Sequence, residues 1–376
     1  MPRPPSLDSI AGRVRELIAR TGATPRPRDA ASVEREFNEL ALDLFAAQFE
    51  ADAAYRRVCE VRGVQTAGVT DWRGIPAVPT VAFKELELTC LPPEARAAVF
   101  HSSGTTRERP GRHFHSRESL ALYEASAWAG LRANVLDAMP PVPRLLALTP
   151  PPAAAPHSSL VRMFEAARSE MREPESCFIG TVDARGAWSL DCEALTSRLR
   201  DAAASDKPVL LLGTAFSSVH LLDELVQHGE RIALPAGSRV LETGGYKGRS
   251  RELPRAELHT LLTGRLGVPP RDIVTEYGMC ELSSQAYPHR HSAPDDSDAP
   301  CVMHFPPWAR ARVISPESGA EVGEGETGLL CVVDLANVWS VSAILTGDLA
   351  VRRGTGFELL GRASQAGQRG CSLMAA

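Results

Sequence analysis

The chain has 376 residues, 44% of them hydrophobic and 23% charged, which is the composition of a globular protein long enough for two domains. Its net charge of -5 argues against general nucleic-acid binding, because such proteins carry an excess of Lys and Arg. No run approaches the roughly 20 apolar residues of a membrane span, and no signal-peptide core is present. We therefore expect a cytoplasmic protein with no nucleic-acid partner. Its eight cysteines form no CxxC pair, so we expect free thiols.

Residues 1–95 are predicted to form a helical and extended region that packs on the core. The stretch "SVEREFNELALDLFAAQFE" at residues 32–50 places Phe37, Leu40 and Leu44 on one helical face, with charges opposite. A Pro-punctuated extended segment, "IPAVPTVAFKELEL", follows it. Nothing in the helix indicates chemistry.

The stretch "VFHSSGTTRERPGRHFH" at residues 99–115 gathers hydroxyls, glycine and arginines. Glycine lets backbone N–H groups approach phosphate oxygens, hydroxyls add donors, and arginine grips phosphate in a bidentate way. We call its first part the hydroxyl loop, which comprises Ser102, Ser103, Gly104, Thr105 and Thr106. The alternative interpretation is an exposed Ser/Thr turn before a helix. A P-loop is not indicated, because no GxxxxGK[ST] motif is present.

Residues 96–300 are predicted to form an α/β core, because short apolar runs alternate with helical patterns. The apolar runs lie at residues 144–149, 209–213, 239–245 and 272–278. This alternation predicts parallel sheets covered by helices on both faces. Ligands gather at the carboxyl ends of such strands, where "GTAFSS", "ETGGYKG" and "EYGMCE" fall.

The pattern of residues 301–362 predicts short antiparallel strands, such as "GLLCVVDL" and "GFELLGR", joined by turns that contain Gly and Pro. We expect a smaller β-rich subdomain there, followed by a short tail at residues 363–376.

Two carboxylates stand out in these regions. Glu281 follows a predicted buried strand in "TEYGMCELSS" and could hold Mg²⁺, which binds oxygen ligands and bridges carboxylates to phosphates. Asp348, in "LTGDLA", could accept hydrogen bonds from paired ribose hydroxyls. Taken alone, each motif favours the ordinary interpretation, a helix-start Glu for the first and a turn Asp for the second.

The ordered set "SSGTT", "YGMCE", "TGD" and "GR" resembles the adenylate-forming superfamily over residues 99–362. The stretches "LETGGYKGRSRE", "FPPWARARVISPESG" and "RGCSL" are similar to the acyl-protein synthetase family, which activates fatty acids in the bacterial bioluminescence reductase complex. Phenylacetate–CoA ligases are more distantly related. The resemblance implies an α/β fold of parallel sheets sandwiched by helices, with a smaller antiparallel β region and the C-terminal domain essentially absent.

The resemblance also implies that ATP and Mg²⁺ are cofactors. The hydroxyl loop would cover the β- and γ-phosphates, and Glu281 would bind Mg²⁺. Tyr277 and Gly278 would complete the strand-end motif. The loop has Arg107 where a Gly is usual and no following Lys, so Arg109 is expected to supply that charge.

The nucleoside would be held by a second set of residues that the resemblance identifies. Gly244, Gly245 and Tyr246 would lie beside adenine, and Asp348 would bind the ribose hydroxyls. Arg362 would match the arginine that precedes the interdomain hinge and contacts ribose or phosphate.

The resemblance implies a reaction that joins a carboxylic acid, of the fatty class, to AMP and then to a thiol. Cys371, in "RGCSL", would be the acyl acceptor before a partner reductase or acyl carrier takes the group, and Cys280 is the competing thiol. One alternative is a ligase that uses CoA as the acceptor. Another is a nucleotide-binding scaffold without catalysis, which Arg107 and Cys280 favour and Glu281 and Asp348 oppose.

Overall fold

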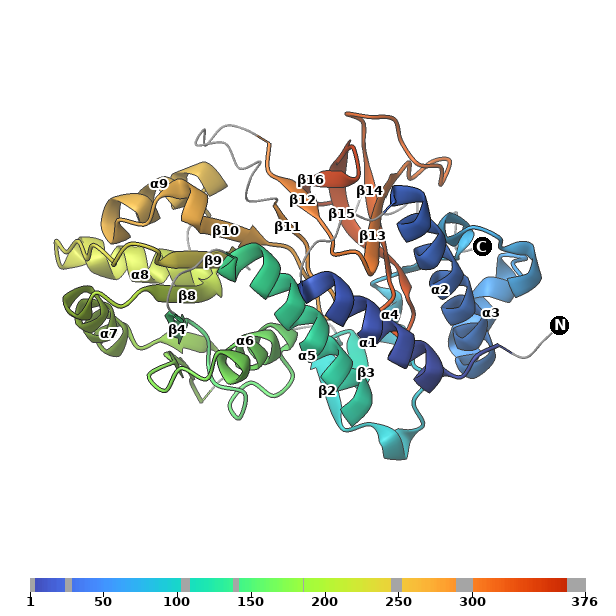
Figure 1. Ribbon diagram of the computed structural model, residues 1–376, viewed down its shortest axis with the longest axis horizontal. Coiled ribbons are helices and arrows are strands. Elements are labelled where there is room, and N and C mark those ends of the chain that lie inside the picture. The colour runs from blue at the N-terminus through green and yellow to red at the C-terminus, as the bar shows by residue number, and fades with distance from the viewer. Residues whose placement is uncertain are drawn as a thin grey trace. The chain divides into compact units, whose positions relative to one another are not determined.

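The computed structural model describes residues 4–23, 29–102, 109–137, 142–184, 186–244, 252–288 and 300–363 (Figure 1). The chain divides into two compact units. The first unit comprises Met1–Gly130, Met279–Ala286 and Val302–Ala376, and the second comprises Leu131–Gly278 and Tyr287–Cys301. Within the described ranges, no helix combines the length and the apolar character that crossing a membrane requires.

Three helices open the first unit: α1 (Leu7–Ala23), α2 (Ala30–Ala51) and α3 (Ala53–Val61). The Asp29 side chain starts α2 by accepting backbone N–H bonds, and Asp52 does the same for α3 where α2 ends. The helix predicted from the apolar spacing is confirmed, since one face of α2 is buried. The buried apolar residues of α2 are Phe37, Leu40, Ala41, Leu44, Phe45 and Ala47.

The sheet of the first unit is largely antiparallel, in the strand order β12-β16-β15-β14-β13, and β1 pairs parallel with β15. The strands are β1 (Val78–Pro79), β12 (Val302–His304), β13 (Ala309–Ile314), β14 (Thr327–Asp334), β15 (Ala343–Arg353) and β16 (Gly356–Arg362). Only the first residue of β14 is exposed, so this central strand is covered on both faces. The expected antiparallel β region is therefore confirmed.

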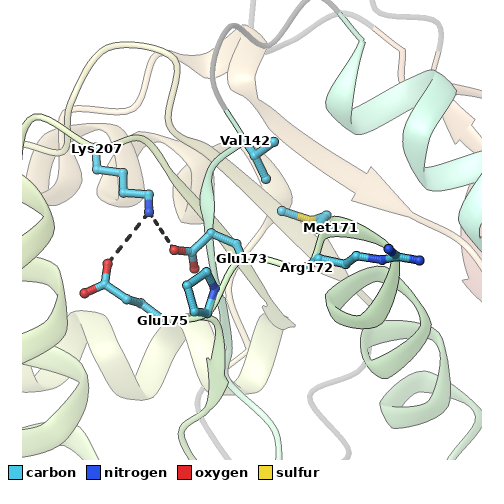
Figure 2. Close-up of a pocket in the computed structure, with 7 residues that line it drawn as sticks. Val142, Met171, Arg172, Glu173, Glu175 and Lys207 are labelled. Atoms are coloured by element: carbon cyan, nitrogen blue, oxygen red, sulfur yellow. Dashed lines mark hydrogen bonds and ion pairs between the residues drawn. The ribbon is translucent and has the colours of Figure 1, made fainter.

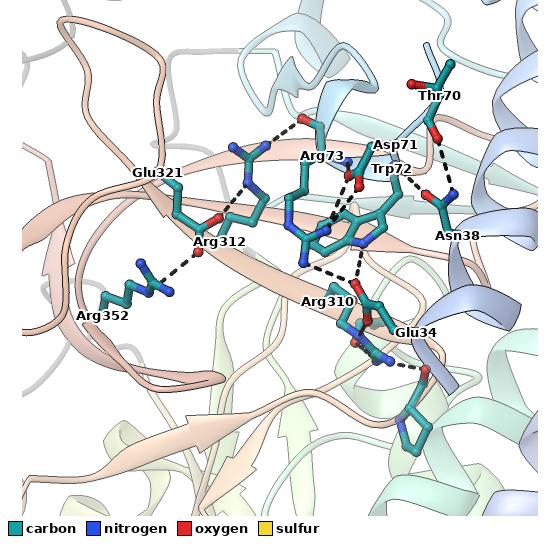
Figure 3. A network of polar contacts seen from close by, with 12 residues as sticks. Glu34, Asn38, Thr70, Asp71, Trp72, Arg73, Arg310, Arg312, Glu321 and Arg352 are labelled. Carbon is teal, nitrogen blue, oxygen red and sulfur yellow. Dashed lines mark hydrogen bonds and ion pairs between the residues drawn. The ribbon is translucent and has the colours of Figure 1, made fainter. Parts of the chain in front are cut away.

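A polar network holds α2 to this sheet (Figure 3). The Glu34 carboxylate accepts hydrogen bonds from Trp72 Nε1 at 2.8 Å and Arg73 Nη2 at 3.1 Å, and lies 3.5 Å from Arg310 Nε on β13. Asn38 accepts from the backbone N–H of Trp72 at 2.7 Å. Burial would raise the pKa of Glu34, but Trp72 and the two arginines lower it below its usual range. The helix is thus fixed by charge as well as by its apolar face.

A hairpin of β2 (Ala98–His101) and β3 (Arg112–His115) brackets residues 102–111 and leads into α5 (Arg117–Leu131). The remaining short elements of the first unit are η1 (Thr66–Gly68), η2 (Trp72–Gly74), α4 (Ala82–Glu85) and η3 (Pro93–Ala95).

The second unit contains a parallel sheet in the order β10-β9-β8-β4-β5. Its strands are β4 (Arg144–Ala147), β5 (Cys177–Phe178), β8 (Val209–Thr214), β9 (Arg239–Thr243) and β10 (Ile273–Glu276). Residues of β4 and β9 are buried without exception, as expected for strands covered on both faces. The apolar runs predicted as parallel strands therefore form them.

Helices of the second unit pack on this sheet, and the apolar side chains of α7, α8 and α9 share one core with it. They are α6 (Ser159–Met171), α7 (Cys192–Ser205), α8 (Ala215–Gln227) and α9 (Arg255–Leu266), with the π-turn η4 (Arg132–Leu136) and η5 (Pro270–Asp272). Thr214 and Ser217 form a capping box at the start of α8. The ribbon β6 (Gly180–Val182) with β7 (Trp188–Leu190) and the short strand β11 (Tyr287–Pro288) complete the unit.

Candidate functional site

The hydroxyl loop begins at a closed base in the first unit. The backbone N–H of Ser102 donates to Gly111 O at 3.0 Å, and the N–H of Gly111 donates to Ser102 Oγ at 2.8 Å. The first bond continues the β2–β3 backbone ladder by one step, and the second adds the Ser102 side chain, so together they fix where the loop leaves the sheet. Ser103, Gly104, Thr105 and Thr106 lie outside the described residues, as does Arg107. Arg109 is described and exposed to solvent.

Glu281 lies against the base of that loop. A Cβ placed on Gly111 would be 2.9 Å from Ser102 Oγ, 3.2 Å from Glu281 Oε1 and 3.4 Å from Phe83 Cβ. Gly111 is thus a glycine because its neighbours occupy the space that a side chain would need. The structure brings Ser102 and Glu281, which are far apart in the sequence, to one place. Gly111 itself was missed, because a Gly after Pro in a polar stretch indicates only a turn.

The environment of Glu281 disfavours an isolated negative charge. Only 4% of the Glu281 surface is exposed to solvent. Burial raises the pKa of Glu281, the thiol of Cys280 and the charge of Arg362 lower it, and the charge of Asp348 raises it again. A cation beside the carboxylate would stabilise its ionised form.

The donor set suits a magnesium ion held jointly by protein and substrate. In the part of the chain that the structure describes, no three His, Cys, Asp or Glu side chains gather closely enough to enclose a metal. Mg²⁺ keeps several waters and binds through one or two carboxylates together with substrate phosphates. Glu281 fits that role, because its carboxyl is buried and lies near Gly111 and Ser102, where the hydroxyl loop begins.

Asp348 and Arg362 are cross-strand partners on β15 and β16. Arg362 Nε lies 3.0 Å from Asp348 Oδ1, and Asp348 N–H donates to Thr346 Oγ1 at 3.2 Å. The Asp348 side chain is 8% exposed, whereas that of Arg362 is 67% exposed. Because the guanidinium faces solvent, the pair is screened and contributes little to stability, and the arginine is open to a ligand. The positive φ of Gly347, 77°, sets the turn that precedes Asp348.

The segment that carries Glu281 is also tied to β3 by a buried histidine that the sequence did not single out. His113 Nδ1 lies 2.7 Å from Cys280 O. Complete burial lowers the pKa of His113 to about 4, so the ring is neutral at physiological pH and donates this bond from Nδ1. Cys280 is buried as well.

Gly244, Tyr277 and Gly278 belong to the second unit. Gly244 directly follows β9 and Tyr277 directly follows β10, and the last residues of these parallel strands, Thr243 and Glu276, are paired. The three residues therefore meet at the carboxyl edge of this sheet, where ligands of α/β proteins bind. Gly245 and Tyr246 fall outside the described residues.

Two buried glutamates occupy the same edge and were not identified from the sequence. Glu242 Oε1 accepts a hydrogen bond from Thr275 Oγ1 at 2.7 Å and lies 3.4 Å from His259 Nε2. Burial raises the pKa of Glu276 to about 7; a bond from Thr243 opposes this rise and the charge of Glu242 adds to it. The available signal was one Glu near the carboxyl end of each predicted buried strand, in "RVLETGG" and "DIVTEYG".

A cavity of about 330 Å³ in the second unit lies away from these residues (Figure 2). It is lined by Val142, Met171, Arg172, Glu173, Pro174, Glu175 and Lys207. Lys207 Nζ lies 2.6 Å from Glu173 Oε1 and 3.8 Å from Glu175 Oε2. Lys207 precedes β8, so the cavity opens at the amino ends of the strands, opposite to Gly244 and Tyr277. No residue predicted for the site lines it.

Comparisons with known proteins show which family the chain resembles. The family described as "Acyl-protein synthetase, LuxE" matches residues 23–376. The long-chain-fatty-acid–luciferin-component ligase of Vibrio harveyi is 24% identical over 329 residues, which cover 85% of this chain and 82% of the relative. The protein of the same name from Aliivibrio fischeri is 26% identical over 197 residues, 49% of each chain.

Solved structures show the same fold. The crystal structure of 2-hydroxyisobutyryl-CoA ligase with 2-HIB-AMP and CoA matches with a TM-score of 0.67 at 14% identity, covering 91% of this chain and 73% of the ligase. The same ligase in its postadenylation state matches with a TM-score of 0.63 at 16% identity, covering 91% and 72%. The resemblance and fold class expected from the sequence are therefore confirmed, and the chain belongs to the acyl-protein synthetase family LuxE.

Proposed function

We propose that this protein activates a carboxylic acid, of the fatty class, with ATP. A carboxylate oxygen attacks the α-phosphorus, the bond from that phosphorus to the bridging oxygen breaks, and pyrophosphate leaves with the electron pair. The products are an acyl-adenylate and pyrophosphate. A thiolate then attacks the acyl carbon, and AMP leaves. Such a reaction needs positioning and charge stabilisation more than covalent chemistry from the protein.

One observation carries this proposal: Glu281 Oε1, Ser102 Oγ and the backbone of Gly111 meet at the base of the hydroxyl loop. A buried carboxylate beside hydroxyl and amide donors is an arrangement suited to a magnesium-bound phosphate chain. In the proposed site the hydroxyl loop holds the β- and γ-phosphates, and Arg109 supplies positive charge. Bound Mg²⁺ would neutralise charge that develops on the phosphates, and Glu281 would hold it.

The nucleoside is assigned residue by residue, as the family resemblance implies. Asp348 accepts hydrogen bonds from the ribose hydroxyls, and the exposed guanidinium of Arg362 contacts ribose or phosphate. Gly244, Gly245 and Tyr246 are assigned to adenine, with Tyr277 and Gly278 at the neighbouring strand end.

The acceptor thiol is assigned to Cys371, for delivery of the acyl group to a partner reductase or acyl carrier. Two observations favour it over Cys280. The thiol of Cys280 is buried and hydrogen-bonded to the carboxylate of Glu281, so it is poorly placed to attack an acyl-adenylate. Arg369 precedes Cys371 by two residues and favours a thiolate there. The relatives named luciferin-component ligases support a protein acceptor; CoA is the second candidate.

The test is ATP–pyrophosphate exchange measured with a panel of fatty and aromatic acids at fixed Mg²⁺. The proposal predicts exchange that requires both the acid and Mg²⁺ and is fastest with a fatty acid. Tight nucleotide binding without exchange for any acid would contradict the proposal and favour a scaffold that has lost catalysis.

A further inference from the structure

The segment that carries Glu281 rests on a buried polar core of the first unit. Residues 279–286 form neither a helix nor a regular strand, so their conformation depends on contacts from elsewhere. Behind them lie Asp334, at the end of β14, and Asn337, in the connection to β15. Both are buried, and so are Ser283 and Ser284. Burying this many polar groups is unfavourable unless their hydrogen bonds are made.

Asn337 hydrogen-bonds the segment at Glu281 itself. Its Nδ2 donates to the backbone oxygen of Glu281 at 2.8 Å and to Val341 O at 3.2 Å. Its Oδ1 accepts from Ser283 Oγ at 2.5 Å. One amide therefore fixes the main chain of the candidate magnesium ligand and the residue two positions later.

Asp334 holds the other side of the same turn. Its Oδ2 accepts from the backbone N–H of Ser283 at 2.8 Å, and its Oδ1 accepts from Ser284 Oγ at 2.7 Å and Ala336 N at 3.0 Å. Trp308 Nε1 donates to Ser284 Oγ at 3.0 Å. With both Asp334 and Asn337 in place, the backbone from Glu281 to Ser284 has little freedom to shift.

We propose that Asn337 and Asp334 are positioning residues that set where the Glu281 carboxylate lies at the base of the hydroxyl loop. This inference rests on the proposed function of Glu281. Each acts through the backbone and hydroxyls of residues 281–284. A shift of that backbone moves the carboxylate, and a misplaced group of this kind lowers the rate rather than substrate affinity.

The same core provides a matched control in Gln48 of α2. Its Nε2 donates to Asn337 O at 2.7 Å and Val338 O at 3.2 Å, and its Oε1 accepts from Ser342 N at 3.2 Å and Ser342 Oγ at 3.0 Å. Gln48 is as buried as Asn337 and makes a comparable set of bonds, but no hydrogen bond joins it to residues 279–286 in the described structure. A purely structural role predicts equal effects from losing either amide.

The test compares Asn337→Ala with Gln48→Ala in the full chain. Both variants are compared at equal concentrations of folded protein. Asn337→Ala should lower kcat of ATP–pyrophosphate exchange about tenfold and raise the Mg²⁺ concentration that gives the half-maximal rate. The KM of the acid should stay within about twofold of the wild-type value. Gln48→Ala loses a bond to the backbone of Asn337 but none to residues 279–286, so both quantities should change by no more than about twofold. Equal losses in the two variants, or a change in the KM of the acid alone, would overturn the inference. Ser283→Ala, which removes one bond to Asn337, should give a smaller loss of the same kind if Asn337→Ala does not fold.

A second readout does not depend on activity. Amide hydrogen exchange of residues 279–286 should accelerate in Asn337→Ala and should accelerate much less in Gln48→Ala. If the wild type shows no pyrophosphate exchange with any acid, the proposed function fails, and the amide measurement still decides whether Asn337 anchors the segment. Unchanged protection of residues 279–286 in Asn337→Ala would show that it does not.

Discussion

Replacing Gly111 by alanine perturbs the point where the hydroxyl loop and Glu281 meet. The new Cβ would lie 2.9 Å from Ser102 Oγ and 3.2 Å from Glu281 Oε1, closer than ordinary van der Waals contact, so these atoms must shift by a few tenths of an ångström. Overpacking of this kind costs about 1–3 kcal/mol of stability. Small shifts of atoms affect catalysis more than they affect folding. We therefore expect the rate of pyrophosphate exchange by the folded variant to fall by about tenfold to a hundredfold as well.

The matched control is Gly12→Ala, in α1 of the same unit. A Cβ at Gly12 meets nothing within 4 Å, so alanine there should stabilise the helix by about 0.5–1 kcal/mol and leave exchange unchanged. Stability is measured by chemical denaturation and activity by initial exchange rates at saturating ATP. If Gly111→Ala exchanges as fast as Gly12→Ala, the base of the loop is not part of the site.

Three further predictions concern other residues of the site. Asp348→Ala should weaken ATP binding by about tenfold, as for loss of a charge-assisted hydrogen bond, and should have little effect on an analogue lacking both ribose hydroxyls; equal penalties for the two nucleotides would remove Asp348 from the ribose. Burial raises the pKa of Glu276 from 4.5 to about 7. The contribution of this group to the free energy of unfolding is therefore complete below pH 4.5 and is lost as pH rises through 7, a change of about 3 kcal/mol. Glu276→Gln should therefore gain stability relative to wild type between pH 4.5 and 7 in denaturation curves; a stability difference that stays constant over this range would contradict the assignment. With ATP and labelled fatty acid, wild type should carry hydroxylamine-labile label that Cys371→Ser lacks while keeping pyrophosphate exchange; label that persists there and vanishes in Cys280→Ser would reassign the acceptor.

Much of the fold could be predicted because it follows from local patterns. The parallel strands of the second unit come from apolar runs long enough to be buried on both faces, and α2 comes from the spacing of Phe37, Leu40 and Leu44. The meeting of Gly244 and Tyr277 also follows, since parallel neighbours end at one edge.

The surroundings of Glu281 could not be predicted in this way. They depend on pairings between distant segments, such as His113 with Cys280 O and Asn337 with Glu281 O. Asp334 ends an apolar strand and Gln48 lies on the buried face of a helix, so each departs from the pattern around it. Such departures indicate a buried polar partner, but the partner becomes known only from the tertiary structure.

The central claim is that the carboxylate of Glu281 holds the magnesium that accompanies ATP. The direct measurement is the Mg²⁺ dependence of ATP–pyrophosphate exchange in wild type and in Glu281→Gln, which keeps the size of the side chain and removes its charge. We predict that exchange falls by about a hundredfold or more in Glu281→Gln, that added Mg²⁺ restores it only in part, and that the melting temperature does not fall. Exchange near the wild-type rate with an unchanged Mg²⁺ dependence would contradict the account.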